Sequence, residues 1–188
     1  LIARAVDEQL DPNEITEKAL TAAMNDIGAD FGAGRVFLPQ VLLSAEAMRE
    51  AFTKLKELLP AAETKKLGTV VIATVKGDVH DLGKNIVAAL LSNSGFELID
   101  LGKDVPAETI VEAAKVNRAD IVGLCALMTT TMTEIETVVE ALKADGSTAK
   151  VMAGGAAVTP EYAAEAGADL YAPDGVAAVK LAKEALHV

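Results

Sequence analysis

The first part of the chain repeats its apolar residues at helical spacing. One helix is predicted to start at Asp11, with Pro12 at its first position and Glu14 placed as in a capping box. Its expected apolar face is Ile15, Ala19, Ala22, Ala23, Ile27 and Phe31. After a break at Gly32 and Gly34, a second helix is predicted over residues 38–59, with an apolar stripe that includes Val41, Ala45 and Met48. Residues 60–68 are short of apolar side chains and are interpreted as an interdomain linker.

The pattern changes after Gly68 to short β-branched runs that alternate with amphipathic segments. Strands are expected at residues 69–75, 96–101, 120–124, 150–153 and 170–171, and helices at 84–93, 106–117, 132–144, 159–166 and 175–186. Five strands that alternate with helices predict an α/β fold with a parallel sheet covered on both faces. Ligands of such sheets bind beyond the carboxyl ends of the strands, so the loops after the first, third and fourth strands are the candidates.

Composition and charge narrow the possible partners. The 188 residues are 51% hydrophobic, which supports a well-buried core. With 17 basic and 28 acidic residues the net charge is −11, which disfavours nucleic acid and anionic membrane as partners. The single cysteine, Cys125, cannot form an internal disulfide, and no signal peptide or membrane-spanning run is visible, so we expect a cytoplasmic protein. Because the chain begins at Leu1 without Met, we expect residues to be missing from the front.

The loop after the first strand places a histidine where ligands bind. Asp78 precedes His80 by two residues and could accept a hydrogen bond from one ring nitrogen, as carboxylates do for metal-ligating histidines. Gly77 and Gly83 would let the backbone turn and a bulky group approach. The same residues also fit a simple helix start, with Asp as cap and an incidental exposed histidine, and local chemistry alone leaves both interpretations open.

The loops after the third and fourth strands carry weaker signals. Three consecutive threonines, residues 129–131, could cap a helix or offer hydroxyls to a polar ligand. Cys125 lacks a nearby base and is a poor candidate for a nucleophile. The pair Gly154 and Gly155 would permit close approach of a ligand to the backbone.

Together the three loops resemble one family. Asp78-x-His80-x-x-Gly83, then Cys125-x-Leu127, then Gly154-Gly155 match the vitamin-B12-binding signature Asp-x-His-x-x-Gly, Ser-x-Leu, Gly-Gly. The chain resembles the corrinoid proteins of cobalamin-dependent methyltransferase systems and is similar to the cobalamin module of methionine synthase. The segments 37–42 and 126–132 look like the branch that works with methyltransferases. The resemblance implies a helical cap domain over residues 1–64, incomplete at its N-terminus, and a flavodoxin-like cobalamin-binding domain with a five-stranded parallel sheet over residues 65–188.

The resemblance also implies roles for individual residues. His80 would bind the cobalt of cobalamin in place of the cofactor's dimethylbenzimidazole, Asp78 would hold the other ring nitrogen, and Thr131 would continue this relay. The displaced nucleotide tail would lie near the second and third loops, and the cap would cover the methyl-bearing face. The implied cofactor contacts are Gly77, Asp78, Val79, His80, Asp81, Leu82, Gly83, Cys125, Leu127, Thr129, Thr131, Gly154 and Gly155. Cys125 departs from the family's serine, and a thiol is a weaker hydrogen-bond donor than a hydroxyl.

The function implied is that of a methyl carrier with no catalysis of its own. It would pass a methyl group from a substrate:corrinoid methyltransferase to a second corrinoid-dependent methyltransferase, with a reductive activase as a further partner. The alternatives are a B12-binding sensor or regulatory module and the B12 domain of a methionine synthase-like enzyme. A phosphoacceptor receiver would need an acidic residue where Cys125 stands, and nicotinamide binding lacks its Gly-x-Gly-x-x-Gly. Methylamines, methanol, glycine betaine and methoxylated aromatics all remain open as donors.

Overall fold

The chain forms two compact units, Leu1–Lys65 and Lys66–Val188. The computed structural model describes residues 2–8, 10, 15–58 and 66–188 of them. The predicted helix start at Asp11 and Pro12, and residues 60–65 of the predicted linker, lie outside the described residues.

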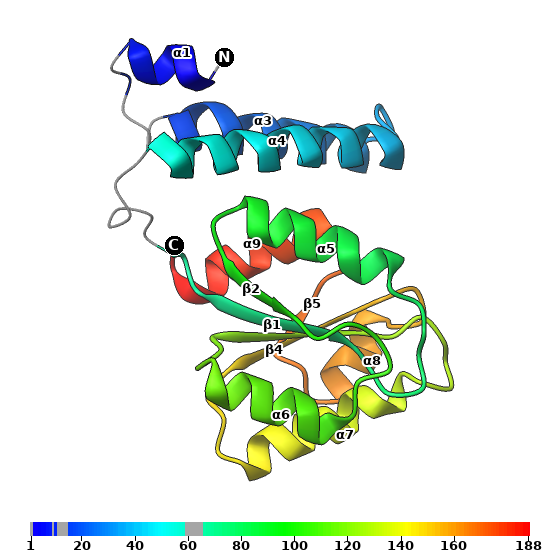
Figure 1. The fold of residues 1–188 in the computed structure, drawn as a ribbon. Helices are drawn as coiled ribbons and strands as arrows, with labels where there is room; N and C mark the ends of the chain where they lie inside the picture. The colour runs from blue at the N-terminus through cyan, green and yellow to red at the C-terminus, as the bar shows by residue number, and fades with distance from the viewer. Residues whose placement is uncertain (1, 9, 11–14, 59–65) are drawn as a thin grey trace. The chain divides into compact units, whose positions relative to one another are not determined.

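The N-terminal unit is helical. Its described elements are α1 (Ile2–Asp7), the π-helix η1 (Ile15–Thr21), α3 (Ala22–Gly32) and α4 (Leu38–Leu58). Helices α3 and α4 lie side by side (Figure 1), and α1 also contacts α4. The two long helices that the apolar spacing predicted are therefore present.

The buried faces of this unit match the sequence in one helix and not in the other. On α4 the predicted stripe is buried at Val41, Ala45 and Met48. Ile15 is buried as well, but three residues of the same predicted face are exposed: Ala19, Ala22 and Ala23. That part of the prediction was wrong because residues 15–21 wind as a π-helix, which shifts the angular phase that an α-helical repeat assumes.

The C-terminal unit alternates strand and helix as predicted. Its elements are β1 (Thr69–Thr74), α5 (Leu82–Asn93), β2 (Glu97–Asp100), α6 (Ala107–Val116), β3 (Ile121–Cys125), α7 (Thr133–Ala144), β4 (Lys150–Gly154), α8 (Pro160–Glu165), β5 (Leu170–Tyr171) and α9 (Gly175–Leu186). The bounds differ from the prediction by a few residues at most. Helix α5, for example, begins at Leu82, two residues earlier than expected.

The five strands form one parallel sheet in the order β2-β1-β3-β4-β5, so the predicted flavodoxin-like arrangement is confirmed. The chain leaves β1 toward β2 at one side and then crosses to β3 at the other. The register pairs Thr74 with Cys125 and Cys125 with Gly154. The carboxyl ends of β1, β3 and β4 therefore lie next to one another, and their following loops meet at one edge of the sheet.

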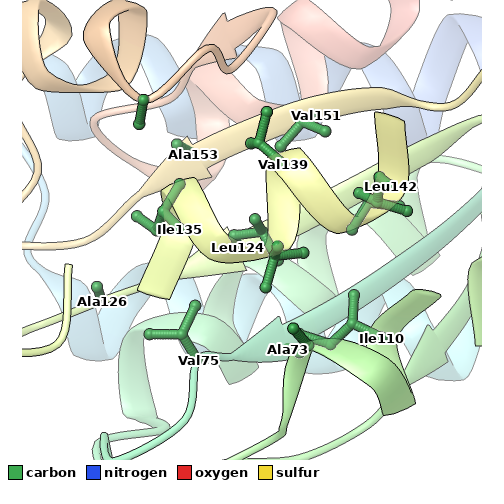
Figure 2. Close-up of a cluster of buried hydrophobic side chains, with 14 of the residues drawn as sticks. Ala73, Val75, Ile110, Leu124, Ala126, Ile135, Val139, Leu142, Val151 and Ala153 are labelled. Atoms are coloured by element: carbon green, nitrogen blue, oxygen red, sulfur yellow. The ribbon is translucent and has the colours of Figure 1, made fainter. Parts of the chain in front are cut away.

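Helices cover both faces of the sheet (Figure 1), with α5 and α9 on one side and α6 and α7 on the other. Alternate residues of a strand serve opposite faces: Ile121 joins the α5–α9 side, whereas Val122 joins the α6–α7 side. Figure 2 shows α7 packed on the second face, and the residues in contact there include Leu124, Ile135, Val139, Leu142, Val151 and Ala153. Each fully buried Val, Leu or Ile stabilises the fold by roughly 1.5–3 kcal/mol. This packing fixes the strand ends that carry the loops.

None of the described helices combines the length and the apolar character that a bilayer span requires.

Candidate functional site

The loop after β1 buries an aspartate and exposes a histidine. The Asp78 side chain has no exposed surface, whereas 48% of the His80 side chain is exposed. Gly77 adopts a left-handed φ of 79°, which lets the chain turn directly after the strand. The Asp78 amide then donates to the carbonyl of Val75, which closes the turn at 3.1 Å. The loop therefore turns Asp78 inward and leaves His80 at the surface.

Asp78 holds His80 at two points. The Nδ1 atom of the His80 ring lies 2.8 Å from Asp78 Oδ1. The backbone amide of His80 donates to the same oxygen at 3.0 Å. A third contact comes from outside the loop, because the buried hydroxyl of Thr74 donates to the His80 carbonyl at 3.1 Å. Both the ring and the backbone of His80 are thus fixed.

The second oxygen of Asp78 accepts its hydrogen bonds from the loop after β3. The Leu127 amide donates to Asp78 Oδ2 at 2.7 Å, and the Met128 amide at 3.3 Å. The Thr131 hydroxyl donates to it at 2.9 Å. The Asp78 carboxylate thus connects two loops that are far apart in sequence, since Asp78 and Leu127 are 49 residues apart.

The electrostatics of Asp78 follow from these contacts. Burial raises the pKa of the carboxyl group, but the hydrogen bonds from the Leu127 and His80 amides, the His80 ring and the Thr131 hydroxyl outweigh it. The net result is a pKa well below the ordinary value of 3.8. Asp78 is therefore ionised at neutral pH in the folded chain.

The ionised carboxylate decides the state of the imidazole. An ionised carboxylate accepts hydrogen bonds and donates none, so Nδ1 of His80 carries the hydrogen that lies between them. In the neutral ring the lone pair then resides on Nε2. That is the arrangement of a metal-ligating histidine with a carboxylate partner.

The loop after β4 lies directly against the loop after β3. The Ala126 amide donates to the Gly154 carbonyl at 3.1 Å. Gly155 has a φ of 120°, and a Cβ atom there would overlap the Ala126 carbonyl oxygen. A Cβ at Gly154 would lie 2.6 Å from the Ala172 carbonyl oxygen. The two glycines are thus required by the packing of the backbone itself.

Gly83 behaves differently. It lies in the first turn of α5, is exposed, and an added Cβ would meet no atom within 4 Å. Nothing in the described protein requires glycine there. The space beside it is available to a ligand.

Five further predicted contact residues lie in or next to the loops at the carboxyl ends of β1 and β3. Three apolar side chains are exposed there, at 57% for Val79, 65% for Leu82 and 43% for Leu127. Thr129 is exposed and Asp81 is half-buried. Asp81 precedes α5 without a capping hydrogen bond from its side chain, so the cap that the alternative interpretation assigned to an aspartate is not formed by Asp81.

The thiol of Cys125 stays protonated at neutral pH. Burial raises its pKa to about 12, with smaller opposing and reinforcing effects from Lys84 and from Asp100. A thiol with that pKa carries almost no thiolate at neutral pH, and the thiolate is the nucleophile. This agrees with the expectation that Cys125 is no nucleophile.

Sequence reasoning missed an ion pair beside the site, between a buried lysine and an exposed aspartate. The Lys84 side chain is buried, and its ammonium group lies 2.6 Å from Asp100 Oδ1 and 2.6 Å from Asn85 Oδ1. The pair ties the start of α5 to the end of β2. Asp100 stands at the carboxyl end of a parallel strand, so the rule that singled out His80 could have found it.

The sequence also could not show the Leu127 and Met128 amides, because backbone donors leave no trace in residue identity. Among the described residues, no three His, Cys, Asp or Glu side chains are grouped to hold a metal ion.

Comparison with known proteins agrees with this geometry. Two models described as B12 binding domain match residues 68–180 and residues 1–56. A dimethylamine corrinoid protein of Methanosarcina barkeri is 47% identical over 181 residues, which cover 95% of this chain and 85% of that protein. A cobalamin-binding protein from Desulfitobacterium hafniense DCB-2 superposes with a TM-score of 0.87 at 31% identity, covering 98% of this chain and 88% of that one. A chain of the methanol:cobalamin methyltransferase complex of Methanosarcina barkeri superposes with a TM-score of 0.81 at 36% identity, covering 94% and 68%. The chain therefore belongs to the B12-binding domain family and is a cobalamin-binding protein.

Proposed function

We propose that the chain is a methyl carrier that binds cobalamin with the dimethylbenzimidazole displaced and with Nε2 of His80 as the lower axial ligand of cobalt. The single observation that carries this proposal is the array in which buried, ionised Asp78 holds Nδ1 of an exposed His80. It leaves a half-exposed imidazole with a free, oriented nitrogen, which is what an axial ligand has to offer.

The chain's own residues would control the ligand. Bound cobalamin would supply a cobalt atom that accepts and releases a methyl group. Asp78 keeps the hydrogen on Nδ1 and so favours ligation through Nε2. Thr131 and the Leu127 amide hold the Asp78 carboxylate in place.

The surroundings of His80 fit a large, partly apolar ring. Val79 and Leu127 expose apolar side chains on the two loops that hydrogen bonds to Asp78 hold together, and Leu82 exposes one at the start of α5. Gly83 leaves room beside α5. These residues would contact the corrin, with Gly77 and Asp81 at its margin.

The displaced nucleotide tail would run past the ends of β3 and β4. In this proposal Cys125, Thr129, Gly154 and Gly155 line its path. Their support is their position at the carboxyl ends of adjacent strands, because the packing of the backbone already accounts for the glycines. The weak donor Cys125 would add little to tail binding.

The partners in the proposal are a substrate:corrinoid methyltransferase, a second corrinoid-dependent methyltransferase and a reductive activase. The structural relative from Methanosarcina barkeri belongs to a complex named for a methyltransferase, which supports the first of them. The donors to test first are dimethylamine, after the more similar relative, and then methanol. The helical unit would cover the methyl-bearing face until a methyltransferase docks.

Reconstitution tests the proposal. The purified chain is incubated with methylcobalamin and passed through gel filtration, and the bound corrinoid is then presented with a dimethylamine:corrinoid methyltransferase. We expect one corrinoid per chain and demethylation of dimethylamine that depends on the loaded chain. A chain that elutes without corrinoid would contradict cobalamin carriage, and a loaded chain that supports transfer from neither dimethylamine nor methanol would contradict these two donors.

A further inference from the structure

The loop after β2 runs alongside the loop that carries His80. The Thr74 amide donates to the Gly102 carbonyl at 3.0 Å, and the Val105 amide donates to the Thr74 carbonyl at 3.1 Å. Val75 and Val105 form a parallel bridge beyond the ends of the named strands. The pairing of β1 with β2 thus continues into their loops, and it brings Asp104 opposite the turn that leads to His80.

Asp104 forms hydrogen bonds with the backbone of two consecutive residues of that turn. Its carboxylate accepts a hydrogen bond from the Gly77 amide at 2.7 Å. Its own amide donates to the Asp78 carbonyl at 3.0 Å. Asp104 therefore fixes the backbone of Asp78, the residue whose side chain holds His80.

The conformation of Asp104 is what allows both contacts. Its backbone φ is 55°, which lies in the left-handed region that residues other than glycine, asparagine and aspartate rarely adopt. Glycine would adopt this conformation without strain but has no acceptor for the Gly77 amide. Aspartate combines the left-handed backbone with an acceptor, at the price of some strain.

We propose that Asp104 is a positioning residue for His80: it fixes the turn at Gly77 and Asp78 and thereby keeps the imidazole in its ligating arrangement. The inference rests on the proposed function, since it assumes that His80 binds cobalt. It assigns no contact between Asp104 and the cofactor. The alternative is that Asp104 is a turn residue whose loss affects its own loop alone.

Three variants separate these possibilities. Asp104→Gly keeps the left-handed backbone and removes the acceptor. Asp104→Asn keeps both the backbone tolerance and a carbonyl oxygen that can accept from Gly77. Arg118→Gly is the matched control, because Arg118 also has a left-handed φ, of 49°, in the turn that precedes β3 at the opposite edge of the sheet.

Two measurements are made on each variant and on wild type. In the chain loaded with methylcobalamin, the visible spectrum gives the ratio of nitrogen-ligated to unligated corrinoid, with His80→Gly as the unligated reference. In the chain without cofactor, hydrogen exchange gives the protection of the His80 amide, which bonds to Asp78 and not to Asp104. The second measurement reports the turn independently of cobalamin.

For Asp104→Gly we expect the ligated ratio to fall about 3- to 10-fold and exchange of the His80 amide to rise by a similar factor, the usual worth of one hydrogen bond. Asp104→Asn should restore both values, and Arg118→Gly should change neither. An unchanged ratio in Asp104→Gly, while His80→Gly abolishes ligation, would overturn this inference and leave the proposed function standing. An equal fall in Arg118→Gly would also overturn it, as a sign of general loosening. Identical spectra of wild type and His80→Gly would overturn the proposed function itself.

Discussion

At the scale of the residue, the site is organised around one buried carboxylate. Asp78 accepts hydrogen bonds from two amides and a hydroxyl of the β3 loop at one oxygen, and from the ring and amide of His80 at the other. A buried charge is tolerated when it is fully hydrogen-bonded, and it then becomes costly to alter. One side chain thus both stabilises the junction of the two loops and sets the tautomer of His80.

The first prediction concerns the removal of that charge. Asp78→Asn keeps the shape of the side chain but turns one acceptor oxygen into a donor, which must face another donor. We expect the free energy of unfolding of the cofactor-free chain at neutral pH to fall by about 2–3 kcal/mol. Urea unfolding measures this, and Asp81→Asn is the control, because the Asp81 side chain forms no capping bond. A loss as large in the control would contradict the assignment.

The same variant has a defined pH dependence. Because the folded pKa of Asp78 lies below the ordinary value of 3.8, its contribution is complete above that pH and is lost as the pH falls through the folded pKa. The difference in unfolding free energy between wild type and Asp78→Asn should be constant above about pH 5 and shrink in stronger acid. A difference that persists undiminished into acid would mean that the ionised form of Asp78 is not what stabilises the fold.

At the scale of the element, the sequence predicts the parallel sheet well and the loops only in part. Runs such as residues 69–75 are β-branched and apolar because both faces of the sheet are covered, so each strand is visible in isolation. The predicted face of residues 15–31 is wrong at three alanines, since a π-helical segment shifts the phase that an α-helical repeat assumes. His80 and Asp78 are close in sequence and could be paired from it. The hydrogen bonds of Asp104 to Gly77 and Asp78 depend on the left-handed φ of Asp104 and on the pairing of Val75 with Val105. Residue identity alone does not reveal either feature.

The second prediction contrasts two glycines of the site. Gly155→Ala would place a Cβ against the Ala126 backbone at a φ of 120°, so we expect it to destabilise the fold by at least about 2 kcal/mol. Gly83→Ala meets no atom within 4 Å and lies in helix α5, so it should keep the stability or raise it by up to about 1 kcal/mol. It should nevertheless lower the amount of methylcobalamin retained, because it fills space assigned to the corrin. Thermal unfolding and cofactor retention after gel filtration measure the two effects. Equal retention by wild type and Gly83→Ala would argue against a corrin beside α5.

At the scale of the whole molecule, we propose a different role for each of the two units. The C-terminal unit would hold the cofactor, and the helical unit would protect its methyl group between encounters. Carrying a reactive group between two enzymes requires both protection and exposure, so a cover that moves is a natural solution. The relatives that match over 94% or more of this chain include both units, which supports treating them together.

The third prediction tests that movement. An amine-reactive cross-linker is applied to the loaded chain, and mass spectrometry selects species that carry a link between the two units. We expect such species to keep their corrinoid and to lose methyl transfer. Species linked within one unit are the control and should transfer normally. Transfer at the unlinked rate by chains linked between the units would contradict a moving cover.

The most direct test of the central claim is the visible spectrum of the methylcobalamin-loaded chain with and without His80. Wild type should show the nitrogen-ligated form, whereas His80→Gly should retain the corrinoid through its tail and show the unligated form. His187→Gly, the change at the other of the two histidines, should leave the spectrum as in wild type. Added imidazole should restore the ligated spectrum of His80→Gly. Identical spectra for wild type and His80→Gly would show that His80 does not bind cobalt.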